Sequence, residues 1–437
     1  MMNRRTFIKN SSIVGSGIAF SKWNFPTENK IKIGIVGVGW WGNEMLLPLI
    51  QQSGVFEIVG ICDVNQVAID ACLENCKKLN IANPQVFKNY KALYDMPDIE
   101  AVVISTPTYW HCLMFVDACK KGLHIYQEKP VCYDIAEGQA MVAAQKKAGN
   151  VVQVGFKSLN SPHIQEVTDF IASGEMGTIK QVIGNLTFGN GAGVTEQSIP
   201  NTIDWDAYCG PVPIQKYMMA KGAKLPSWKS SEAMDLGSHF DWGLHYFNNA
   251  RHILNLDLPN SVSAFGGNIN KNGIQTPDYL NVNWDYNGLP VQFNLRMWGS
   301  IDPLPNNAVG VYLYGEKATV FVGEFGWEIY TNGKPKVSHG EVGFKPWTPE
   351  FRTMMPANIL KLITGFAEGI RAKSNKNIIA PLDDSFKATA AMIYADMAYK
   401  TKSFLEIDKN TMGIKNNLTA NKMLKRTYRQ PYIHPTV

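Results

Sequence analysis

Residues 31–42 read IKIGIVGVGWWG, and this stretch decides the fold. Its first half, residues 31–36, is largely apolar and β-branched, which predicts a buried strand. Glycines follow in the spacing G-x-G-x-x-G, and a helical pattern begins within it. A strand, this spacing and a helix, in that order, predict a tight turn where a pyrophosphate can approach a helix N-terminus. We therefore expect a dinucleotide-binding turn formed by Gly37, Gly39, Trp41 and Gly42.

The second strand ends in an acidic residue. Phe56–Cys62 has the pattern of a buried strand, and Asp63 follows it, 26 residues after Gly37. A carboxylate at this place accepts hydrogen bonds from the hydroxyls of an adenosine ribose and repels a 2′-phosphate. Val64 and Asn65 come next, so no arginine follows directly to hold such a phosphate. The sequence therefore favours NAD over NADP.

The periodicity of the chain changes once. Strands alternate with helical patterns up to about residue 154, which predicts a parallel, doubly wound sheet. Beyond about residue 178 the strands are longer and separated by turns, which predicts a sheet with one helix-covered face. We expect an α/β protein: an N-terminal Rossmann domain, then a C-terminal α+β domain with a large, mostly antiparallel open sheet.

The expected boundaries follow from this change of pattern. They are 1–30 for a signal and linker, 31–150 for the Rossmann domain, and 151–437 for the substrate-binding and oligomerisation domain with its C-terminal helices and tail. Within the last part, helical patterns span 231–254, 357–372 and 383–400. An open sheet with a bare face suits pairing between subunits, so we expect a homodimer or homotetramer.

Composition excludes several classes of protein. The chain has 437 residues, 45% hydrophobic and 18% charged, which is enough for two cores and unlike a disordered chain. The net charge is +5, but the basic residues are dispersed, so we expect no nucleic-acid partner. There are seven cysteines and no C-x-x-C pair, which argues against a tetrahedral zinc site. Cys72 and Cys76 are interpreted as buried small hydrophobes.

The N-terminus has the features of an export signal. Residues 3–9 read NRRTFIK, and a short, weakly apolar stretch follows from Ser11 to Phe20. This resembles a twin-arginine signal, which a receptor reads to export folded proteins. We therefore expect an exported or periplasmic protein that engages the export machinery and is tethered to the membrane if the signal is uncleaved. The alternative is a disordered basic tail.

Further motifs after the third and fourth strands identify a family resemblance. Ser105-Thr106-Pro107 with His111 downstream, and then Glu128-Lys129-Pro130, resemble the Gfo/Idh/MocA oxidoreductases over residues 31–430. The resemblance implies that Thr106, Pro107, His111, Glu128 and Lys129 lie at the cofactor. It also implies that Lys129 lies beside the reacting carbon of a sugar, sugar derivative or cyclic polyol.

Residues 234–247, MDLGSHFDWGLHYF, hold the candidate acid and base. The D-x-x-x-H motif of the family is matched to Asp235 and His239, which lie on one face if the segment is helical. The resemblance implies His239 as the base, Asp235 as the residue that orients it or binds substrate, and Lys129 as the group that polarises the oxygen. Asp241 and His245 are given supporting or structural roles. A metal held by Asp235, His239 and His245 is disfavoured because these residues do not share one helical face.

The sequence thus predicts an NAD-dependent oxidoreductase that acts on CH–OH groups of carbohydrates. An exported enzyme has no free nicotinamide pool, so we expect a tightly bound cofactor. One alternative is a redox-neutral glycosidase that oxidises a ring carbon transiently and eliminates a substituent. Another is a sugar sensor without catalysis. Two local departures from the family stand out: Gly155-Phe156-Lys157-Ser158 lacks the arginine common in relatives, and residues 228–234 lack a glycine pair.

Overall fold

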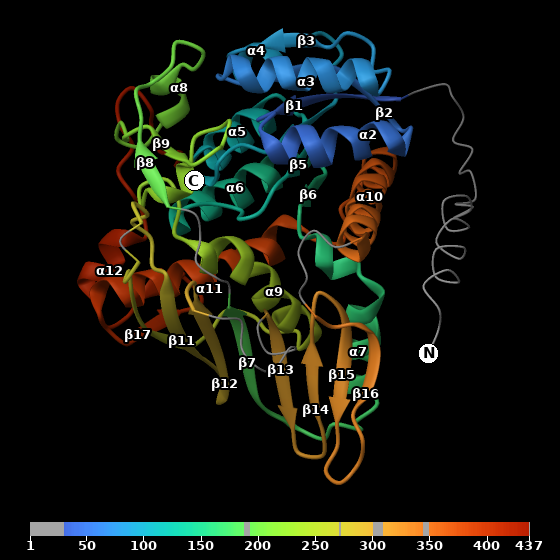
Figure 1. The fold of residues 1–437 in the computed structure, drawn as a ribbon, viewed down its shortest axis with the longest axis vertical. Helices are drawn as coiled ribbons and strands as arrows, with labels where there is room; N and C mark the ends of the chain where they lie inside the picture. The colour runs from blue at the N-terminus through green and yellow to red at the C-terminus, as the bar shows by residue number, and fades with distance from the viewer. Residues whose placement is uncertain (1–29, 188–192, 271, 300–308, 344–348, 437) are drawn as a thin grey trace.

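The computed structural model of the chain describes residues 30–187, 193–270, 272–299, 309–343 and 349–436. The predicted export signal at residues 3–20 lies outside these ranges. Two sheets form the body of the molecule, one in each half of the chain (Figure 1). Every helix in the described ranges is too short or too polar to cross a lipid bilayer.

The first sheet confirms the predicted Rossmann domain. All of its pairings are parallel, and the strand order is β3-β2-β1-β4-β5-β6. The order reverses between β1 and β4, and ligands of such sheets bind at the carboxyl ends of the strands beside that reversal. The strands are β1 (Ile31–Val36), β2 (Phe56–Cys62), β3 (Gln85–Phe87), β4 (Ala101–Ile104), β5 (His124–Gln127) and β6 (Val152–Val154).

The helices of this domain start at the polar residues that cap them. Asn65, Asn89 and Asp134 each accept a hydrogen bond from a backbone N–H in the first turn of the helix that follows. The glycine-rich turn leads into a π-helical turn before the first α-helix. The elements are η1 (Gly42–Leu46), α2 (Leu47–Ser53), α3 (Gln66–Lys78), α4 (Tyr90–Tyr94), α5 (Thr108–Lys120) and α6 (Ile135–Ala148).

The second sheet has ten strands and confirms the predicted large open sheet. Its order is β16-β15-β14-β13-β7-β12-β11-β10-β17-β18, and every pairing is antiparallel except that of β7 with β12. The strands are β7 (Ile179–Thr187), β10 (Ser261–Gly267), β11 (Tyr279–Tyr286), β12 (Leu289–Arg296), β13 (Val309–Gly315), β14 (Thr319–Val322), β15 (Phe325–Tyr330), β16 (Val337–Glu341), β17 (Leu405–Asp408) and β18 (Gly413–Ile414).

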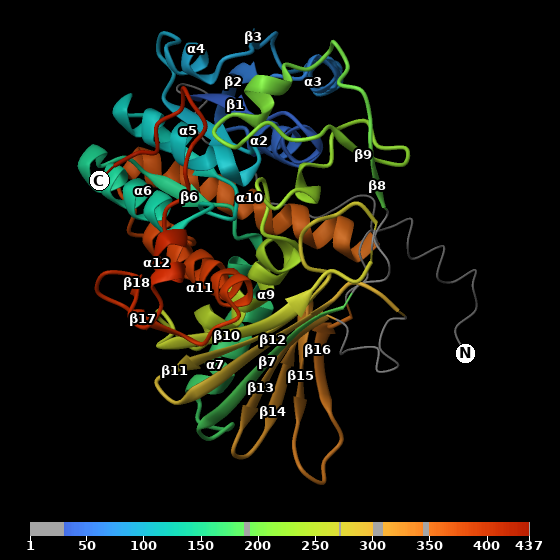
Figure 2. The same cartoon turned by 90° about the vertical axis from the view of Figure 1, so that its left-hand side faces the viewer.

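Helices cover one face of this sheet and connect it to the Rossmann domain (Figure 2). Helix α10 (Pro349–Ala372) returns to the first domain, where the Phe366 ring stacks on Phe56 with centroids 6.0 Å apart. The other elements are η2 (Lys157–Asn160), α7 (Pro162–Ala172), β8 (Val194–Glu196), α8 (Trp205–Cys209), β9 (Met218–Ala220), η3 (Trp228–Ser230), η4 (His239–Gly243), α9 (Leu244–Ile253), α11 (Leu382–Thr401) and α12 (Leu418–Met423).

The predicted helix over 231–254 is only partly correct. Gly237 adopts φ +107°, a conformation that favours glycine, and the chain before it is not helical. A π-helical turn, η4, begins at His239 and continues into α9. Asp235 therefore lies in the loop before the helix, and the one-face argument that joined it to His239 is wrong. Asp241 and His245 are both within the helical segment.

All seven cysteines are buried and free, as the interpretation of Cys72 and Cys76 required. Cys72 is 0% and Cys76 2% exposed, in the core between α3 and the Rossmann sheet. The contact with the Cys76 thiol, together with burial, raises the pKa of the Cys72 thiol, which keeps it protonated. These cysteines contribute packing.

The helix that carries Asp241 and His245 depends on a close approach at Gly243. A Cβ added there would lie 2.5 Å from Cζ of Phe293, a buried residue of β12. We expect Gly243→Ala to lower the free energy of unfolding by about 1–3 kcal/mol, because the ring must shift in a packed core. Denaturant unfolding of the purified variant measures this change.

Gly365→Ala is the matched control. Gly365 lies inside α10, and a Cβ there would meet nothing within 4 Å. The control is expected to be neutral or more stable by up to about 1 kcal/mol, because alanine favours a helix interior. Equal destabilisation by the two variants would contradict the assigned close approach.

Candidate active site

The glycine-rich turn has the close approaches that a dinucleotide site requires. Gly37 has φ +86°, and a Cβ there would lie 2.7 Å from the carbonyl carbon of Ser105. A Cβ at Gly42 would lie 2.1 Å from the Gly37 oxygen, so only glycine allows the helix to begin so near the turn. At Gly39, in contrast, a Cβ would meet only Leu225 at 3.8 Å. The backbone at Gly39 is therefore open to a phosphate, as the fit to NAD requires.

Asp63 lies directly beside this turn. Its Oδ2 accepts a hydrogen bond from the Val38 N–H at 3.0 Å, and its Oδ1 accepts one from the Asn65 N–H at 2.9 Å. Burial raises the pKa of Asp63 to about 6, against the effect of these hydrogen bonds. Each carboxylate oxygen keeps a second lone pair, which can accept a bond from a ribose hydroxyl. The residue therefore fits the predicted contact with an adenosine ribose.

His111 connects two of the predicted cofactor segments. Its Nδ1 lies 2.8 Å from the Pro130 oxygen and its Nε2 lies 2.9 Å from the Thr106 oxygen. Burial lowers its pKa to about 4, so the ring is neutral at pH 7 and donates to one of the two carbonyls. Pro107 precedes the first residue of α5. The geometry gives His111 a positioning role for these turns.

Glu128 follows β5 and is only 6% exposed. Burial raises its pKa to about 7, while the Trp41 indole, Lys129 and Lys157 favour the ionised form. A Cβ at Gly155 would lie 2.6 Å from the Glu128 carboxylate oxygens, so the chain after β6 runs against this acid. Trp41 and Glu128, distant in sequence, are thus brought together at the carboxyl edge of the sheet.

Lys129 reaches across to the second domain. Its Nζ forms an ion pair with the Asp241 carboxylate and donates a hydrogen bond to the Asp241 main-chain oxygen at 3.2 Å. Lys229 forms an ion pair with the other oxygen of the same carboxylate. The two ammonium groups hold the pKa of Asp241 well below its usual range, so this carboxylate stays ionised at all working pH values.

His245 lies one turn beyond Asp241 and faces the same charges. Burial, with Lys129 and Lys157 nearby, lowers its pKa well below the usual range, so the imidazole is neutral. Its ring lies 6.0 Å from the Phe156 ring, and its Nδ1 is buried without a protein partner. A neutral imidazole with an unused nitrogen beside a lysine can accept a proton from a substrate hydroxyl.

The structure separates Asp235 from His239. Asp235 is 2% exposed, burial raises its pKa to about 7, and the charges of Lys229 and Asp241 act on it, so it belongs to the Lys129 cluster. His239 is fully buried, and both of its ring nitrogens lack protein partners. Burial lowers its pKa to about 3, and the one charge that adds to this effect is Lys400 of α11.

The charges of Lys129, Lys229 and Asp241 therefore act on Asp235, whereas the charge that acts on His239 is Lys400 of α11. The catalytic role of His239 stays a prediction without geometric support, whereas His245 has the position that this role requires. The quoted stretch contains a second D-x-x-x-H, Asp241 to His245, with the same spacing. This second motif was the sequence feature that could have identified His245. The positive φ of Gly237 decides between the two pairs, because it leaves Asp235 outside the helical segment.

Two further lysines were missed from the sequence. Lys229 precedes the helix, and Lys157 follows β6 in the segment that lacks the family's arginine. Lys157 Nζ lies 3.0 Å from Glu324, both side chains being about 5% exposed, and the Tyr246 hydroxyl donates to the same acid at 2.5 Å. Glu324 comes from the far end of the sheet, so no local pattern predicts this pair.

In the described part of the chain, the one group of three with metal-ligand geometry is Asp134, Glu137 and His434, whose ligand atoms lie within 4.8 Å of one another. Arg426 Nε donates to Glu137 at 2.8 Å, and the Tyr428 hydroxyl donates to the same oxygen at 2.7 Å. An arginine already balances this charge, so the group serves as an ion-pair network. The residues of 234–247 do not join it.

The raised pKa of Asp235 predicts a pH-dependent stability. Because the folded state favours the protonated acid up to about pH 7, whereas an exposed aspartate ionises near 3.8, stability is lost as the pH rises between these values. We expect Asp235→Asn to gain free energy of unfolding relative to wild type between pH 5 and pH 8. Denaturant unfolding at both pH values measures this gain. Asp98→Asn, at a side chain 77% exposed, is the control and gains nothing.

Comparison with known proteins supports the same fold. Residues 31–156 match the family model described as "Oxidoreductase family, NAD-binding Rossmann fold". A protein of Shewanella sp. (strain ANA-3), "Glycosyl hydrolase family 109 protein 1", is 33% identical over 116 residues, which are 26% of this chain and 25% of that protein. The match to this curated relative therefore spans about a quarter of its length.

Solved structures match over most of the chain. An aldose-aldose oxidoreductase from Caulobacter crescentus, complexed with glycerol, has a TM-score of 0.64 at 17% identity and covers 87% of this chain and 100% of its own. A levoglucosan dehydrogenase, in complex with NADH and levoglucosan, has a TM-score of 0.64 at 15% identity, with coverages of 86% and 99%. At these identities the likeness shows the fold. The first domain of this chain, residues 31–156, is thus similar to the NAD-binding Rossmann domain of the Gfo/Idh/MocA oxidoreductases.

Proposed function

We propose that this protein is an NAD-dependent oxidoreductase that transfers a hydride between the nicotinamide and a CH–OH carbon of a sugar, glycoside or cyclic polyol. The observation that carries the proposal is the cluster of Lys129, Asp241 and His245 at the carboxyl edge of the Rossmann sheet. Lys129 is joined to Asp241 by an ion pair, and His245 lies beside both. The sugar dehydrogenase folds among the solved structures support the substrate class.

Each residue of the cluster has a role that its environment allows. The Lys129 ammonium can donate a hydrogen bond to the substrate oxygen and stabilise negative charge there. The neutral His245 imidazole can accept the hydroxyl proton, because no protein group occupies its Nδ1. Asp241 holds Lys129 in place from the second domain. NAD, when bound, supplies the hydride acceptor. Asp235 faces the same cluster and can hydrogen-bond a second substrate hydroxyl.

The cofactor assignment rests on the first domain. Gly37 and Gly42 allow the tight turn, Gly39 leaves its backbone open to a pyrophosphate, and the Asp63 carboxylate beside the turn would repel a 2′-phosphate. These residues support NAD over NADP. Export through the N-terminal signal is part of the same proposal, with a cofactor loaded before export and recycled in the site.

A second candidate is a redox-neutral glycosidase. The match to a glycosyl hydrolase family 109 protein over 116 residues favours it. The Glu128-Lys129-Pro130 motif, on which the resemblance to the Gfo/Idh/MocA oxidoreductases depends, favours the dehydrogenase. The two candidates share the first chemical step and differ in whether a substituent leaves the ring.

A glycoside assay separates them. Purified protein is incubated with an aryl glycoside and no added nicotinamide, and aglycone is measured against the enzyme concentration. We expect less than one equivalent of aglycone, because a dehydrogenase stops once its bound NAD is reduced. Many turnovers of aglycone would establish the glycosidase instead. The protein without cofactor, prepared by denaturation and refolding, is the control.

A pair of histidine variants tests the assignment of the base. We expect His245→Gln to lower kcat by about 10²–10⁴-fold with little change in cofactor binding, the usual contribution of a positioned base. His239→Gln alters the neighbouring turn of the same helix and is expected to change kcat by less than about tenfold. Steady-state kinetics with bound NAD, at matched thermal stability, measure both. A larger loss in His239→Gln would restore the role predicted from the sequence.

A further inference from the structure

A segment of the second half of the chain lies across the Asp63 loop. We call residues 202–212 the strap. The Gln66 N–H donates to the Thr202 oxygen at 2.7 Å, and the Asp204 N–H donates to the Val64 oxygen at 3.1 Å. Asn65 and Ile203 form an isolated antiparallel bridge between them. The strap is thus bonded to the residues that directly follow the predicted ribose acid.

The strap also passes near the acid itself. The Asp63 carboxylate acts electrostatically on the Tyr208 hydroxyl, and burial raises the pKa of both groups. Trp205 stacks on Tyr208 with ring centroids 4.9 Å apart. Further along the chain, Leu225 lies 3.8 Å from the position of a Cβ at Gly39. Residues 202–225 therefore run from the ribose end of the predicted cofactor site to its pyrophosphate end.

Two side chains of α5 fix the strap to the Rossmann domain. The Tyr109 hydroxyl donates to the Tyr208 oxygen at 2.8 Å, and the Trp110 Nε1–H donates to the same oxygen at 3.2 Å. The strap turns at Gly210, where φ is +53° and a Cβ would lie 2.3 Å from the Trp110 ring. These contacts join segments about a hundred residues apart in the chain.

The C-terminal tail holds the strap from its outer side. Arg429 Nη1 lies 2.7 Å from the Asp206 carboxylate, and its Nη2 donates to the Gly210 oxygen at 2.9 Å. Its Nε donates to the Val212 oxygen at 3.0 Å, and its main-chain N–H donates to the Pro211 oxygen at 2.8 Å. One arginine thus satisfies several carbonyl groups of the strap and one of its acids.

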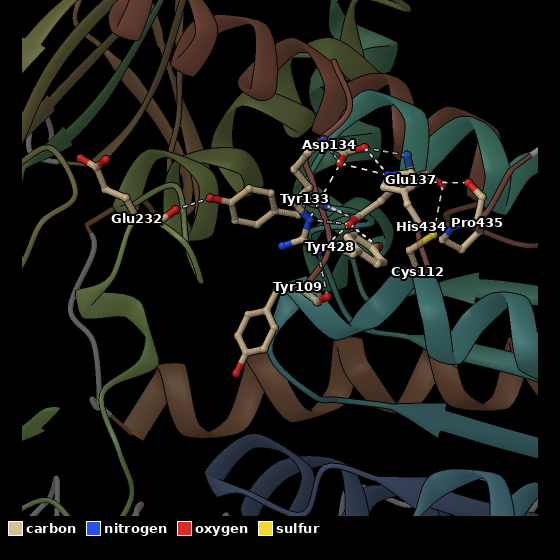
Figure 3. A network of polar contacts seen from close by, with 10 residues as sticks. Tyr109, Cys112, Tyr133, Asp134, Glu137, Glu232, Tyr428, His434 and Pro435 are labelled. Atoms are coloured by element: carbon tan, nitrogen blue, oxygen red, sulfur yellow. Dashed lines mark hydrogen bonds and ion pairs between the residues drawn. The ribbon is translucent and has the colours of Figure 1, made fainter. Parts of the chain in front are cut away.

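The tail is in turn anchored at α6, as Figure 3 shows. Arg426 and the Tyr428 hydroxyl both bind Glu137, and His434 Nε2 lies 3.2 Å from the Asp134 carboxylate. Arg426 Nη2 also donates to the Tyr109 oxygen at 2.8 Å, so the anchor and the strap share α5. Glu137 and Asp134 are 0% and 2% exposed, which protects these charged bonds from water.

We infer that the strap, held by Arg429, retains the adenosine half of a dinucleotide in its site, so that the cofactor leaves only when the strap lifts. The inference rests on the proposed NAD-dependent function and adds the residues that govern cofactor release. Arg429 is a positioning residue in this scheme: it touches the strap and acts on the cofactor through it.

The test is the dissociation rate of NADH from the full-length protein. NADH fluorescence is followed after addition of excess NAD. We expect Arg429→Met to release NADH at least about tenfold faster than wild type, since it loses a charged anchor and its carbonyl bonds. Arg429→Lys keeps the charge but not the forked geometry and is expected to fall between the two. Lys216→Met, which breaks an exposed ion pair with Glu196 in the adjacent hairpin, is the control.

The outcomes separate the strap from the proposed function. Faster release in Arg429→Met, with kcat and the melting temperature unchanged, supports the strap. Equal release rates in wild type and Arg429→Met overturn the strap and leave the proposed function intact. No NADH binding to wild type overturns both. If Arg429→Met melts at a lower temperature, the test is repeated with Asp206→Asn, which removes only the exposed partner of the ion pair. Faster release by a smaller factor in Asp206→Asn then supports the strap, and an unchanged release rate overturns it.

Discussion

The ion pair between Lys129 and Asp241 is the contact on which the candidate site depends. Lys129 follows the last residues of β5 in the first domain, and Asp241 is in the π-helical turn that opens α9 in the second. Both side chains are largely buried, at 13% and 16% exposure. Removing Asp241 costs about 3–5 kcal/mol, because the charge of the largely buried Lys129 is then left without this partner. The pair therefore fixes how the two domains meet.

Lys229 extends this constraint to the loop before the helix. A carboxylate offers two oxygens, and at Asp241 each is taken by a different lysine. The loop of Lys229 must therefore stay close to the helix. As a result, the charges of Lys229 and Asp241 also act on the Asp235 carboxyl in that loop. Asp235 and Glu128 both have a pKa raised to about 7 by burial. The site thus combines one carboxylate that is always ionised with two that change charge near neutral pH.

The fold was predictable because its signals are local. A strand, three glycines at fixed spacing and a helix occur within residues 31–53, and the steric limits at Gly37 and Gly42 explain why that spacing is required. The change from a helix–strand alternation to long strands marks the second sheet equally well. The parallel pairing of β7 with β12 could not be predicted, because strand neighbours depend on contacts between residues more than a hundred positions apart.

For the candidate site, the sequence predicts which residue types take part but not which aspartate and histidine come together. Two D-x-x-x-H pairs overlap in MDLGSHFDWGLHYF, and spacing alone cannot rank them. A single backbone conformation, the positive φ of Gly237, ends the loop and leaves Asp235 outside the helix, whereas Asp241 and His245 stay within it. Lys157 with Glu324, and Arg429 with the strap, are pairs between segments that share no pattern in the sequence.

The distribution of charge explains why the neutral histidine must be the one near Lys129. Burial, together with the ammonium groups of Lys129 and Lys157, lowers the pKa of His245, so its imidazole stays uncharged, and Lys129 is paired with Asp241. A base and a cationic hydrogen-bond donor can then coexist next to one substrate oxygen. At His239 burial also keeps the ring neutral, but the charge that acts on it is Lys400 of α11 and not Lys129. Neutrality alone therefore does not make a catalytic base; it requires the neighbouring lysine that the second D-x-x-x-H pair provides.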